Sequence, residues 1–373
     1  KCWGASGDGY LGYGGLYYNS VGVAVPVINN AIQVAHGDYH TCALISDHTI
    51  QCWGMGEYGQ LGGGISGYSY ATALPQTVVG ISTAIQVTGA GYGTCALLSD
   101  NTVQCWGNTQ YGMLGNGTSG WGAQDTPVPV SVITDAIQIS GGYEHRCAVL
   151  SGGGVKCWGR NGSGQLGTGS YVASYSSTPV DVINISNATK VSLGRERSCA
   201  LLSTGSVMCW GSGGTATPTA VAGITTAVDI AAGENHSCAV LANGTIRCWG
   251  SGGQGQLGNG SNSSSSTPVA VTGIANALEI NSGNDFSCAL LADQKMKCWG
   301  YNGSGTFGNG VISGNSNIPV YRLSDQAIDS IGLGHGYGYN QCHLSSGQIF
   351  CTGTNNWGQT GINLLVPHQV SGL

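Results

Sequence analysis

The chain has 373 residues, and charged residues make up only 8% of it, against about 25% in a typical soluble protein. Its 11 Lys and Arg and 17 Asp and Glu give a net charge of −6, so it lacks the basic surface that nucleic-acid binding requires. No run of about 20 apolar residues predicts a membrane-spanning helix. We therefore expect neither a nucleic-acid partner nor membrane insertion.

A Cys-Trp-Gly motif recurs along the whole chain. It begins at Cys2, Cys52, Cys105, Cys157, Cys209, Cys248 and Cys298, and a degenerate copy begins at Cys351. All but one of the steps between copies are 50–53 residues long, a period that is typical of solenoids, propellers and arrays. No linker or shift in composition divides the chain, so residues 1–373 are predicted to form a single domain.

Each period contains four short extended segments separated by Gly, Ser and Asn. In one unit these segments are residues 126–130, 136–140, 147–150 and 155–158. No stretch of helical length carries a 3.6-residue apolar period. Short strands at regular spacing indicate an all-β fold, and four strands per unit are typical of a propeller blade.

A glycine-rich loop recurs after the Cys-Trp-Gly strand, as in residues 162–167 and 253–258. Glycines at fixed repeat positions indicate backbone with positive φ or close approach of two chain segments, not disorder. The unit from Cys209 to Cys248 lacks this loop, which explains its step of 39 residues.

Seven further cysteines lie nine or ten residues before a cysteine of the motif, and most begin Cys-Ala-Leu or Cys-Ala-Val. The residues between each pair predict strand, tight turn and strand, and opposed residues of such a hairpin lie about 4.5–5.5 Å apart, within disulfide range. Structural zinc sites use closer spacing, and seven opposed pairs argue against reduced core cysteines. The predicted disulfides are Cys42–Cys52, Cys95–Cys105, Cys147–Cys157, Cys199–Cys209, Cys238–Cys248, Cys288–Cys298 and Cys342–Cys351.

Disulfides in this number persist in oxidising compartments. The sequence therefore predicts an extracellular or cell-surface protein whose leader is not in this chain. Each bond closes a short loop, so we expect it to stabilise its own hairpin by about 2–3 kcal/mol rather than to join one blade to the next.

A search for catalytic motifs finds none. His40, His145 and His236 each lie two residues before a Cys-Ala pair, and we expect them to be structural residues of the repeat. No nucleophile elbow, Walker loop or metal-ligand motif is present. We predict that the chain is not an enzyme and needs no cofactor or metal.

The loop before each Cys-Ala strand is the strongest candidate for binding. It leads off the inner strand, so in a propeller these loops should gather on one face near the axis. They carry acids and aromatic rings that could bind a cation, a basic partner or a sugar, or could form a solvated rim. The candidates are Asp38, Tyr39, Tyr92, Tyr143, Glu144, Glu196, Glu234, Asp285, Phe286 and Tyr339.

Asn-x-Ser/Thr sequences also recur. In a host that glycosylates, the copies predicted to lie in loops are plausible acceptors. These are Asn116, Asn161, Asn243, Asn259, Asn262 and Asn302.

The order of these elements resembles the repeat of the regulator of chromosome condensation family. Residues 37–44 and 233–240, with the pattern Gly-x-x-His-x-Cys-Ala-Leu/Val, match it well. The resemblance covers nearly the whole chain and implies a seven-bladed β-propeller of four-stranded antiparallel blades. The eukaryotic founder of the family binds chromatin and drives nucleotide exchange on a small GTPase. The low basic charge and the disulfides make secreted bacterial propellers of this fold, including β-lactamase inhibitors, the better relatives.

Cys2 remains without a local partner. It could bond to Cys342 and close the ring while freeing Cys351, bond to a neighbouring molecule, or bond to a segment upstream. A surplus strand at each end, the second at residues 366–370, could also add to a neighbour's sheet edge and form a filament.

We therefore expect a non-enzymatic extracellular propeller with a structural or adhesive role, possible partners being other copies of itself. The alternative is a monomeric secreted propeller that recognises a protein or glycan through its acidic and aromatic face.

Overall fold

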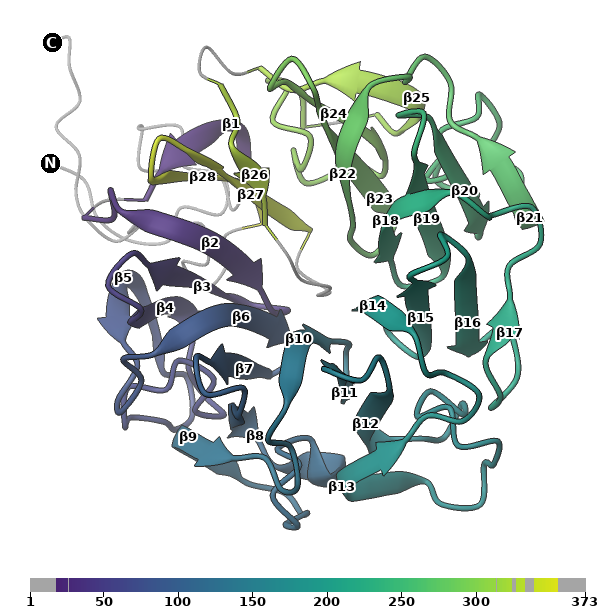
Figure 1. Ribbon diagram of the computed structural model, residues 1–373. Helices are drawn as coiled ribbons and strands as arrows, with labels where there is room; N and C mark the ends of the chain where they lie inside the picture. Colours follow the sequence, from purple (N-terminus) through teal and green to yellow (C-terminus); the bar gives the residue numbers. More distant parts are fainter. Residues whose placement is uncertain (1–17, 26, 313, 324–326, 333–338, 355–373) are drawn as a thin grey trace, which may run out of the picture.

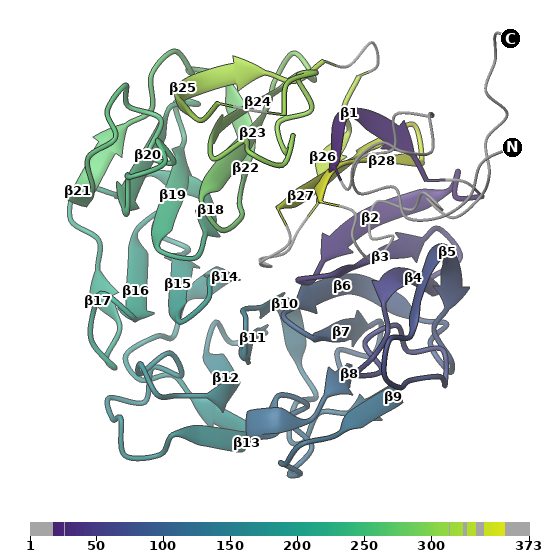
Figure 2. The ribbon, with the colours of Figure 1, turned by 180° about the vertical axis from the view of Figure 1, so that it is seen from behind.

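The computed structural model describes residues 18–25, 27–312, 314–323, 327–332 and 339–354. They form seven four-stranded antiparallel sheets arranged as blades around a central axis (Figure 1; Figure 2 shows the opposite face). This arrangement confirms the predicted seven-bladed propeller. We number the blades 1 to 7 along the chain; blades 1 to 6 each use four consecutive strands, and blade 7 combines strands from both ends of the described chain.

The strands occupy four equivalent positions, from the axis outward. The innermost strands are β2 (Ala31–His36), β6 (Ala84–Ala90), β10 (Ala136–Gly141), β14 (Ala188–Leu193), β18 (Ala227–Ala232), β22 (Ala277–Ser282) and β26 (Ser330–Ile331). The second strands are β3 (His40–Ile45), β7 (Gly93–Leu98), β11 (His145–Leu150), β15 (Arg197–Leu202), β19 (His236–Leu241), β23 (Phe286–Leu291) and β27 (Asn340–Ser345). The third strands are β4 (Ile50–Met55), β8 (Val103–Asn108), β12 (Val155–Arg160), β16 (Val207–Gly211), β20 (Ile246–Gly250), β24 (Met296–Gly300) and β28 (Gln348–Thr354). The outer strands are β5 (Ala71–Thr77), β9 (Ala123–Pro129), β13 (Tyr175–Asp181), β17 (Thr219–Ala220), β21 (Ser265–Ala270), β25 (Ser316–Tyr321) and β1 (Tyr18–Ala24), and one 3-10 turn, η1 (Gln110–Gly112), follows β8.

The apolar core lies between adjacent blades. Between blades 1 and 2, for example, Leu44 and Ile50 of blade 1 pack in one cluster with Val87 and Trp106 of blade 2. Because each sheet is packed on both faces, all six residues of β3, including polar ones, are buried. A strand covered on both faces needs no polar and apolar alternation, which is why the Cys-Ala-Leu segments are continuously apolar.

Every blade carries one disulfide between its second and third strands, as predicted. The bonded cysteines lie directly opposite each other, with 4.1 Å between their Cα atoms in each pair. The bonds are Cys42–Cys52, Cys95–Cys105, Cys147–Cys157, Cys199–Cys209, Cys238–Cys248, Cys288–Cys298 and Cys342–Cys351.

Blade 7 closes the ring by pairing β1 with β28, and Tyr18 lies opposite Thr354. The closing strand therefore takes the outer position, because the third position is already filled by the degenerate Cys351-Thr-Gly copy. The hypothesis that Cys2 bonds to Cys342 and frees Cys351 is wrong, since these two cysteines are bonded to each other. Cys2 itself lies outside the described residues, as do residues 366–370.

The glycine-rich loop between the third and outer strands packs against the tryptophan of the next blade. The indole Nε1 of Trp210 donates to the Gln165 carbonyl at 2.8 Å, and the side chain of Leu166 is buried at the same junction. The matching bonds run from Trp106 to Gln60 O, from Trp158 to Met113 O and from Trp299 to Gln256 O. The loop thus satisfies a buried donor that the core could not otherwise accommodate.

A hydroxyl and a histidine support the same carbonyl. Ser198 Oγ donates to Gln165 O at 2.9 Å, and His145 Nε2 lies 2.9 Å from that hydroxyl. Since the hydroxyl hydrogen is used by the carbonyl, the histidine must donate through Nε2–H. His40 with Thr94, and His236 with Ser287, form equivalent pairs. These contacts between blades support the structural role expected for the repeated histidines.

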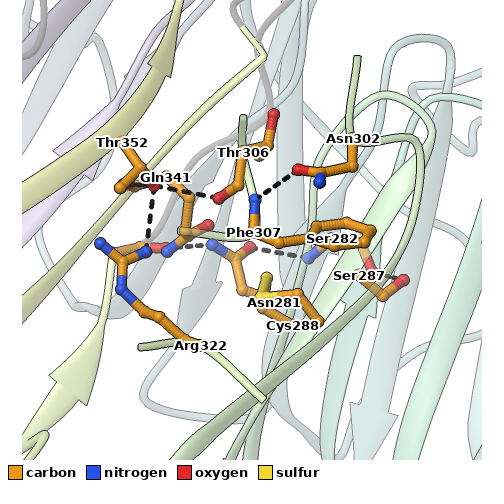
Figure 3. Close-up of a disulfide and its surroundings, with 12 residues drawn as sticks. Asn281, Ser282, Ser287, Cys288, Asn302, Thr306, Phe307, Arg322, Gln341 and Thr352 are labelled. Atoms are coloured by element: carbon orange, nitrogen blue, oxygen red, sulfur yellow. Dashed lines mark hydrogen bonds between the residues drawn. A yellow bond between two sulfur atoms is a disulfide. The ribbon is translucent and has the colours of Figure 1, made fainter. Parts of the chain in front are cut away.

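The junction between blades 6 and 7 shows how a missing tryptophan is replaced. Thr352 stands at the tryptophan position, and its hydroxyl donates to the Thr306 carbonyl at 2.9 Å (Figure 3). Arg322, which is buried, donates to Thr352 Oγ1 at 3.0 Å, and its guanidinium lies against Gly308 of the loop. Burial lowers the pKa of Arg322 to about 9.

Blade 4 lacks the loop, as the sequence predicted. Between β16 and β17 the chain makes a short turn in which Gly214 N donates to Gly211 O. One consequence is that Cys209 is only partly buried, whereas the other bonded cysteines are at most 2% exposed.

We expect a mild reductant to open the Cys199–Cys209 bond first, because thiol–disulfide exchange requires access to a sulfur atom. Stepwise reduction at neutral pH, alkylation and peptide mapping would give the order. The Cys95–Cys105 bond, whose cysteines are 2% and 0% exposed, is the matched control. Simultaneous opening of the two bonds would show that reduction follows global unfolding instead.

Side chains from the inner strands join neighbouring blades around the axis. Gln33, Gln86 and Gln138 each accept from a backbone N–H of the next inner strand. At the following equivalent positions Lys190 pairs with Asp229, and Asp229 also accepts from Ile280 N at 3.0 Å. A series of polar contacts therefore links the inner strands of neighbouring blades.

Candidate binding face

The loops that join inner and second strands meet on one face of the ring, as expected. Backbone bonds connect neighbouring loops: Asp38 N donates to Gly91 O at 3.0 Å, and Glu234 N donates to Gly283 O at 3.3 Å. These bonds fix adjacent loops relative to each other, so side chains from different blades form one continuous surface.

Four tyrosines of this face form a cluster over blades 1 to 3. The Tyr92 ring lies 6.1 Å from Tyr39, 5.1 Å from Tyr58 and 6.2 Å from Tyr143, measured between ring centroids. All four side chains are half-buried. Tyrosine is enriched among the residues that dominate protein interfaces.

Asp38 and Arg146, which lie in or beside the loops that carry the tyrosines, are buried, so Asp38 is not a surface acid as the sequence suggested. Arg146 donates to the carbonyls of Gly142, His145 and Ala90. Burial raises the pKa of Asp38 well above its ordinary value, and burial lowers that of Arg146 to about 10. Their role is to hold the loops beneath the tyrosines.

The glutamates of the face are paired with two arginines. Arg160 lies 2.5 Å from Glu144 and 3.6 Å from Glu196, and Arg195 lies 2.8 Å from Glu234. Arg195 also lies over the Tyr143 ring, 5.4 Å from its centroid. The acids are brought together as predicted, but two arginines offset most of the charge of these three glutamates, so the face is a network of ion pairs and not a strongly negative site.

A second, smaller group lies over blades 6 and 7. The rings of Tyr301 and Tyr339 are 4.6 Å apart, and Asp285 accepts from Gln256 Nε2 at 3.1 Å. Partial burial raises the pKa of Asp285 and of Tyr339. Phe286 was expected on this face but is 2% exposed, because it takes the position that His40 occupies in blade 1 and packs in the core.

Sequence reasoning missed four residues of this face: Tyr58, Tyr301, Arg160 and Arg195. Tyr58 lies in the glycine-rich loop, and Tyr301 and Arg160 directly follow Cys-Trp-Gly, so they reach the face from a different part of the repeat. Arg195 lies in a loop that was singled out, next to Glu196, and an Arg-Glu sequence there was a usable signal.

Within the described residues, no cluster of three or more potential metal ligands is present. No described helix is long and apolar enough to span a membrane.

Two of the predicted glycosylation candidates are unsuitable. Asn161 and Asn302 are 2% and 1% exposed, because their side chains bind the backbone of the glycine-rich loops. Asn243 and Asn262 are exposed, and Asn116 and Asn259 are partly exposed.

We expect folded protein produced in a glycosylating secretory host to carry glycan at Asn243 and Asn262 and to carry none at Asn161 and Asn302. Glycopeptide mapping would test this. Occupancy at Asn161 in folded material would contradict the burial of its amide.

Comparison with known proteins identifies the family. Two models, both described as "Regulator of chromosome condensation (RCC1) repeat", match the chain, one at residues 31–60, 136–165, 227–256 and 278–306 and the other at residues 100–149, 153–201 and 243–290. Together they cover more than half of it. The chain belongs to the regulator of chromosome condensation repeat family.

Curated relatives in this family include the probable E3 ubiquitin-protein ligase HERC4 of Mus musculus, 32% identical over 191 residues, which are 49% of this chain and 17% of the relative. The ultraviolet-B receptor UVR8 of Arabidopsis thaliana is 30% identical over 182 residues, 48% of this chain and 41% of the relative. The alignment thus covers less than half of the length of either relative.

Solved structures with the same fold include human WBSCR16, with a TM-score of 0.74 and 18% identity over 87% of this chain and 86% of that chain. A second is yeast RCC1 (Prp20) bound by Kap60, with a TM-score of 0.72 and 19% identity over 87% of this chain and 80% of that chain. At these identities the likeness is one of fold.

Proposed function

We propose that this RCC1-repeat propeller is a non-enzymatic recognition domain that binds a protein through the tyrosine-rich face. The observation that carries the proposal is the cluster of Tyr39, Tyr58, Tyr92 and Tyr143, drawn from three blades and held by buried Asp38 and Arg146. Clustered, half-buried aromatic rings, one of them under the Arg195 guanidinium, are typical of the centre of an interface.

Structures of the same fold support a protein partner. Yeast Prp20, a propeller of this fold, has been solved bound to Kap60, and a second structure of it is described together with its binding to Gsp1p and histones. Those partners belong to that protein. For this chain, the low basic charge and the balanced Arg–Glu pairs favour a partner recognised by aromatic contact rather than by strong charge.

The seven disulfides support an extracellular or cell-surface location for this recognition.

Site-specific photo-crosslinking would test the face. A benzophenone amino acid at position 92 is expected to crosslink a partner in extracellular extracts of the source, whereas the same group at position 68, where Tyr68 is 92% exposed on an outer loop, is expected not to. A Tyr39→Ser, Tyr143→Ser variant that carries the same group at position 92 should lose the same species. Crosslinks at position 68 alone would contradict the proposal, and a crosslinked glycan without protein would favour the glycan alternative.

A structural or adhesive role through self-assembly is the second candidate. Its support is that the seven local disulfides use 14 of the 15 cysteines and leave Cys2 over. If Cys2 joins two molecules, Cys2→Ser should convert oligomers to monomers in light scattering without reductant. Unchanged monomers before and after the substitution would remove this candidate.

A further inference from the structure

A cleft of about 300 Å³ lies between blades 4 and 5, outside the tyrosine-rich face. Its lining includes Arg197 and Cys209 of blade 4 and Trp249 of blade 5, together with Val221 and Ala222 beyond β17. We call it the blade 4–5 cleft. A volume of this size is at the lower end for ligand sites and suits a short peptide segment.

The cleft is the place that the glycine-rich loop fills at equivalent junctions. The step from Cys157 to Cys209 is 52 residues and that from Cys209 to Cys248 is 39, so blade 4 is shorter by 13 residues. Residues 212–215 form a tight turn, and Arg197 Nε donates to Ser212 O at 3.1 Å. This turn is too short to cover Trp249, which is 5% exposed, while Trp53, Trp106, Trp158, Trp210 and Trp299 are at most 1% exposed.

Three hydrogen-bond donors remain where the loop would bind. The Trp249 indole N–H has no acceptor among the described residues, although Trp210 Nε1 donates to a loop carbonyl. Ser237 is 1% exposed, and within the described residues its hydroxyl contacts only Cys199 Sγ, at 3.8 Å, whereas the hydroxyl of Ser198 at the equivalent position donates to Gln165 O.

The third donor is the backbone N–H of Ala222. At five equivalent positions this group donates to the carbonyl of the last loop glycine: Val79 to Gly62, Ser131 to Gly115, Ile183 to Gly167, Thr272 to Gly258 and Leu323 to Gly308. Ala222 has no such bond within the described residues, and it is exposed. The cleft thus presents the donors that elsewhere bind the carbonyls of a Gln-Leu-Gly tripeptide.

The occupied junctions also show which side chains fit. Leu166 and Leu257 are at most 1% exposed where they fill the apolar part of the junction. The next residue must be glycine: a Cβ on Gly167, whose φ is +69°, would lie 2.8 Å from both Trp210 Nε1 and Val182 Cγ1. A ligand for an equivalent site therefore needs a large apolar residue followed by glycine; this residue is leucine in most loops and Phe307 in blade 6.

We propose that the blade 4–5 cleft is a docking site for a Gln-Leu-Gly loop presented by a protein partner. The leucine would enter the apolar pocket beside Trp249 and Val221. The carbonyl before it would accept from the Trp249 indole and the Ser237 hydroxyl, and the glycine carbonyl would accept from Ala222 N. This site is separate from the tyrosine-rich face, so it stands whether or not that face binds a partner.

A cyclic peptide of sequence Gly-Ser-Gly-Gln-Leu-Gly, copied from residues 162–167, is the probe, since cyclisation reduces the ordering cost of a short loop. Fluorescence polarisation with labelled peptide should show saturable binding to the wild-type chain. Changing the glycine after leucine to alanine, or the leucine to aspartate, should weaken binding at least tenfold. Peptide variants leave the fold of the protein untouched.

Two protein variants locate the site. Trp249→Phe keeps the aromatic packing and removes the indole donor, so binding should fall several-fold, while Trp299→Phe at an occupied junction should leave it unchanged. Replacing residues 212–215 by the sequence of residues 160–176 restores the missing loop and should abolish binding. Protection of Cys209 from reduction in this graft confirms that the new loop fills the cleft.

Equal binding of the leucine and aspartate peptides, or binding that survives the graft, would overturn the proposal. So would absence of binding at about 1 mM peptide, the limit of useful affinity. Self-association of the wild-type chain that the graft abolishes, without peptide binding, would instead assign the cleft to a second copy of this chain.

Discussion

Trp106→Ala is expected to lower the free energy of unfolding by about 4 kcal/mol. The side chain is fully buried between blades 1 and 2, and its indole donates to Gln60 O at 3.0 Å. Removing the indole leaves a cavity between the blades. The glycine-rich loop, including Gly62, then has no ring to pack against. Guanidinium unfolding under oxidising conditions, followed by circular dichroism, would measure the loss.

Trp249→Ala is the matched comparison, with an expected loss of about 2 kcal/mol, because a cavity that opens to solvent costs less. Trp249 occupies the equivalent position in blade 5 but borders the blade 4–5 cleft and has no loop above it. If the two substitutions destabilise the chain equally, the loop contributes nothing to the tryptophan site, and the argument that the cleft is an unfilled loop site fails as well.

The fold was predictable because each repeat contains the same local sequence pattern. The spacing of Cys147 and Cys157 predicted both the hairpin and its disulfide, and the structure places the two residues opposite each other. Ring closure was not predictable in detail, since several terminal segments could have supplied the last strand. In the structure β1 pairs with β28 and completes blade 7. The repeat period alone does not determine which terminal segment takes this position.

The sequence predicted where the candidate site lies but not its charge distribution. Loop position identified Tyr92, Tyr143 and Glu234 correctly as neighbours on one face, because propeller topology brings equivalent loops together. Their electrostatics were not visible, since Arg160 enters from a third strand and pairs with Glu144 only after folding. Burial of Phe286 was hidden for a similar reason: the residue begins a strand and packs inward.

Blade 4 shows that several features of the repeat change together. It lacks the glycine-rich loop, and Arg197 stands where blades 1, 3 and 5 have histidine. In blade 3, for example, the histidine donates to the hydroxyl that binds the loop carbonyl. In a blade without the loop, a histidine at this position would have no such function. Burial lowers the pKa of Arg197, whose guanidinium lines the cleft. This coordinated change favours a blade adapted for a ligand over a simple deletion.

His40→Phe is expected to make the chain more resistant to acid. His40 is fully buried, and burial lowers its pKa from the ordinary 6.5 to about 3, with Arg146 and His36 adding to the effect. Because the unfolded chain binds the proton more readily, stability from this group is complete above pH 6.5 and decreases as the pH falls. Each pH unit costs about 1.4 kcal/mol, or about 3 kcal/mol between pH 6.5 and 4.

Phenylalanine removes this titration and suits the position, since Phe286 occupies it in blade 6. Thr94 keeps its bond to Gln60 O and loses only the contact with the imidazole, so the variant should be about 1 kcal/mol less stable at pH 7. At pH 4 the order should reverse, with the variant more stable by about 2 kcal/mol. Guanidinium unfolding at the two pH values measures both differences. A constant difference would mean that His40 is not held neutral in the folded chain.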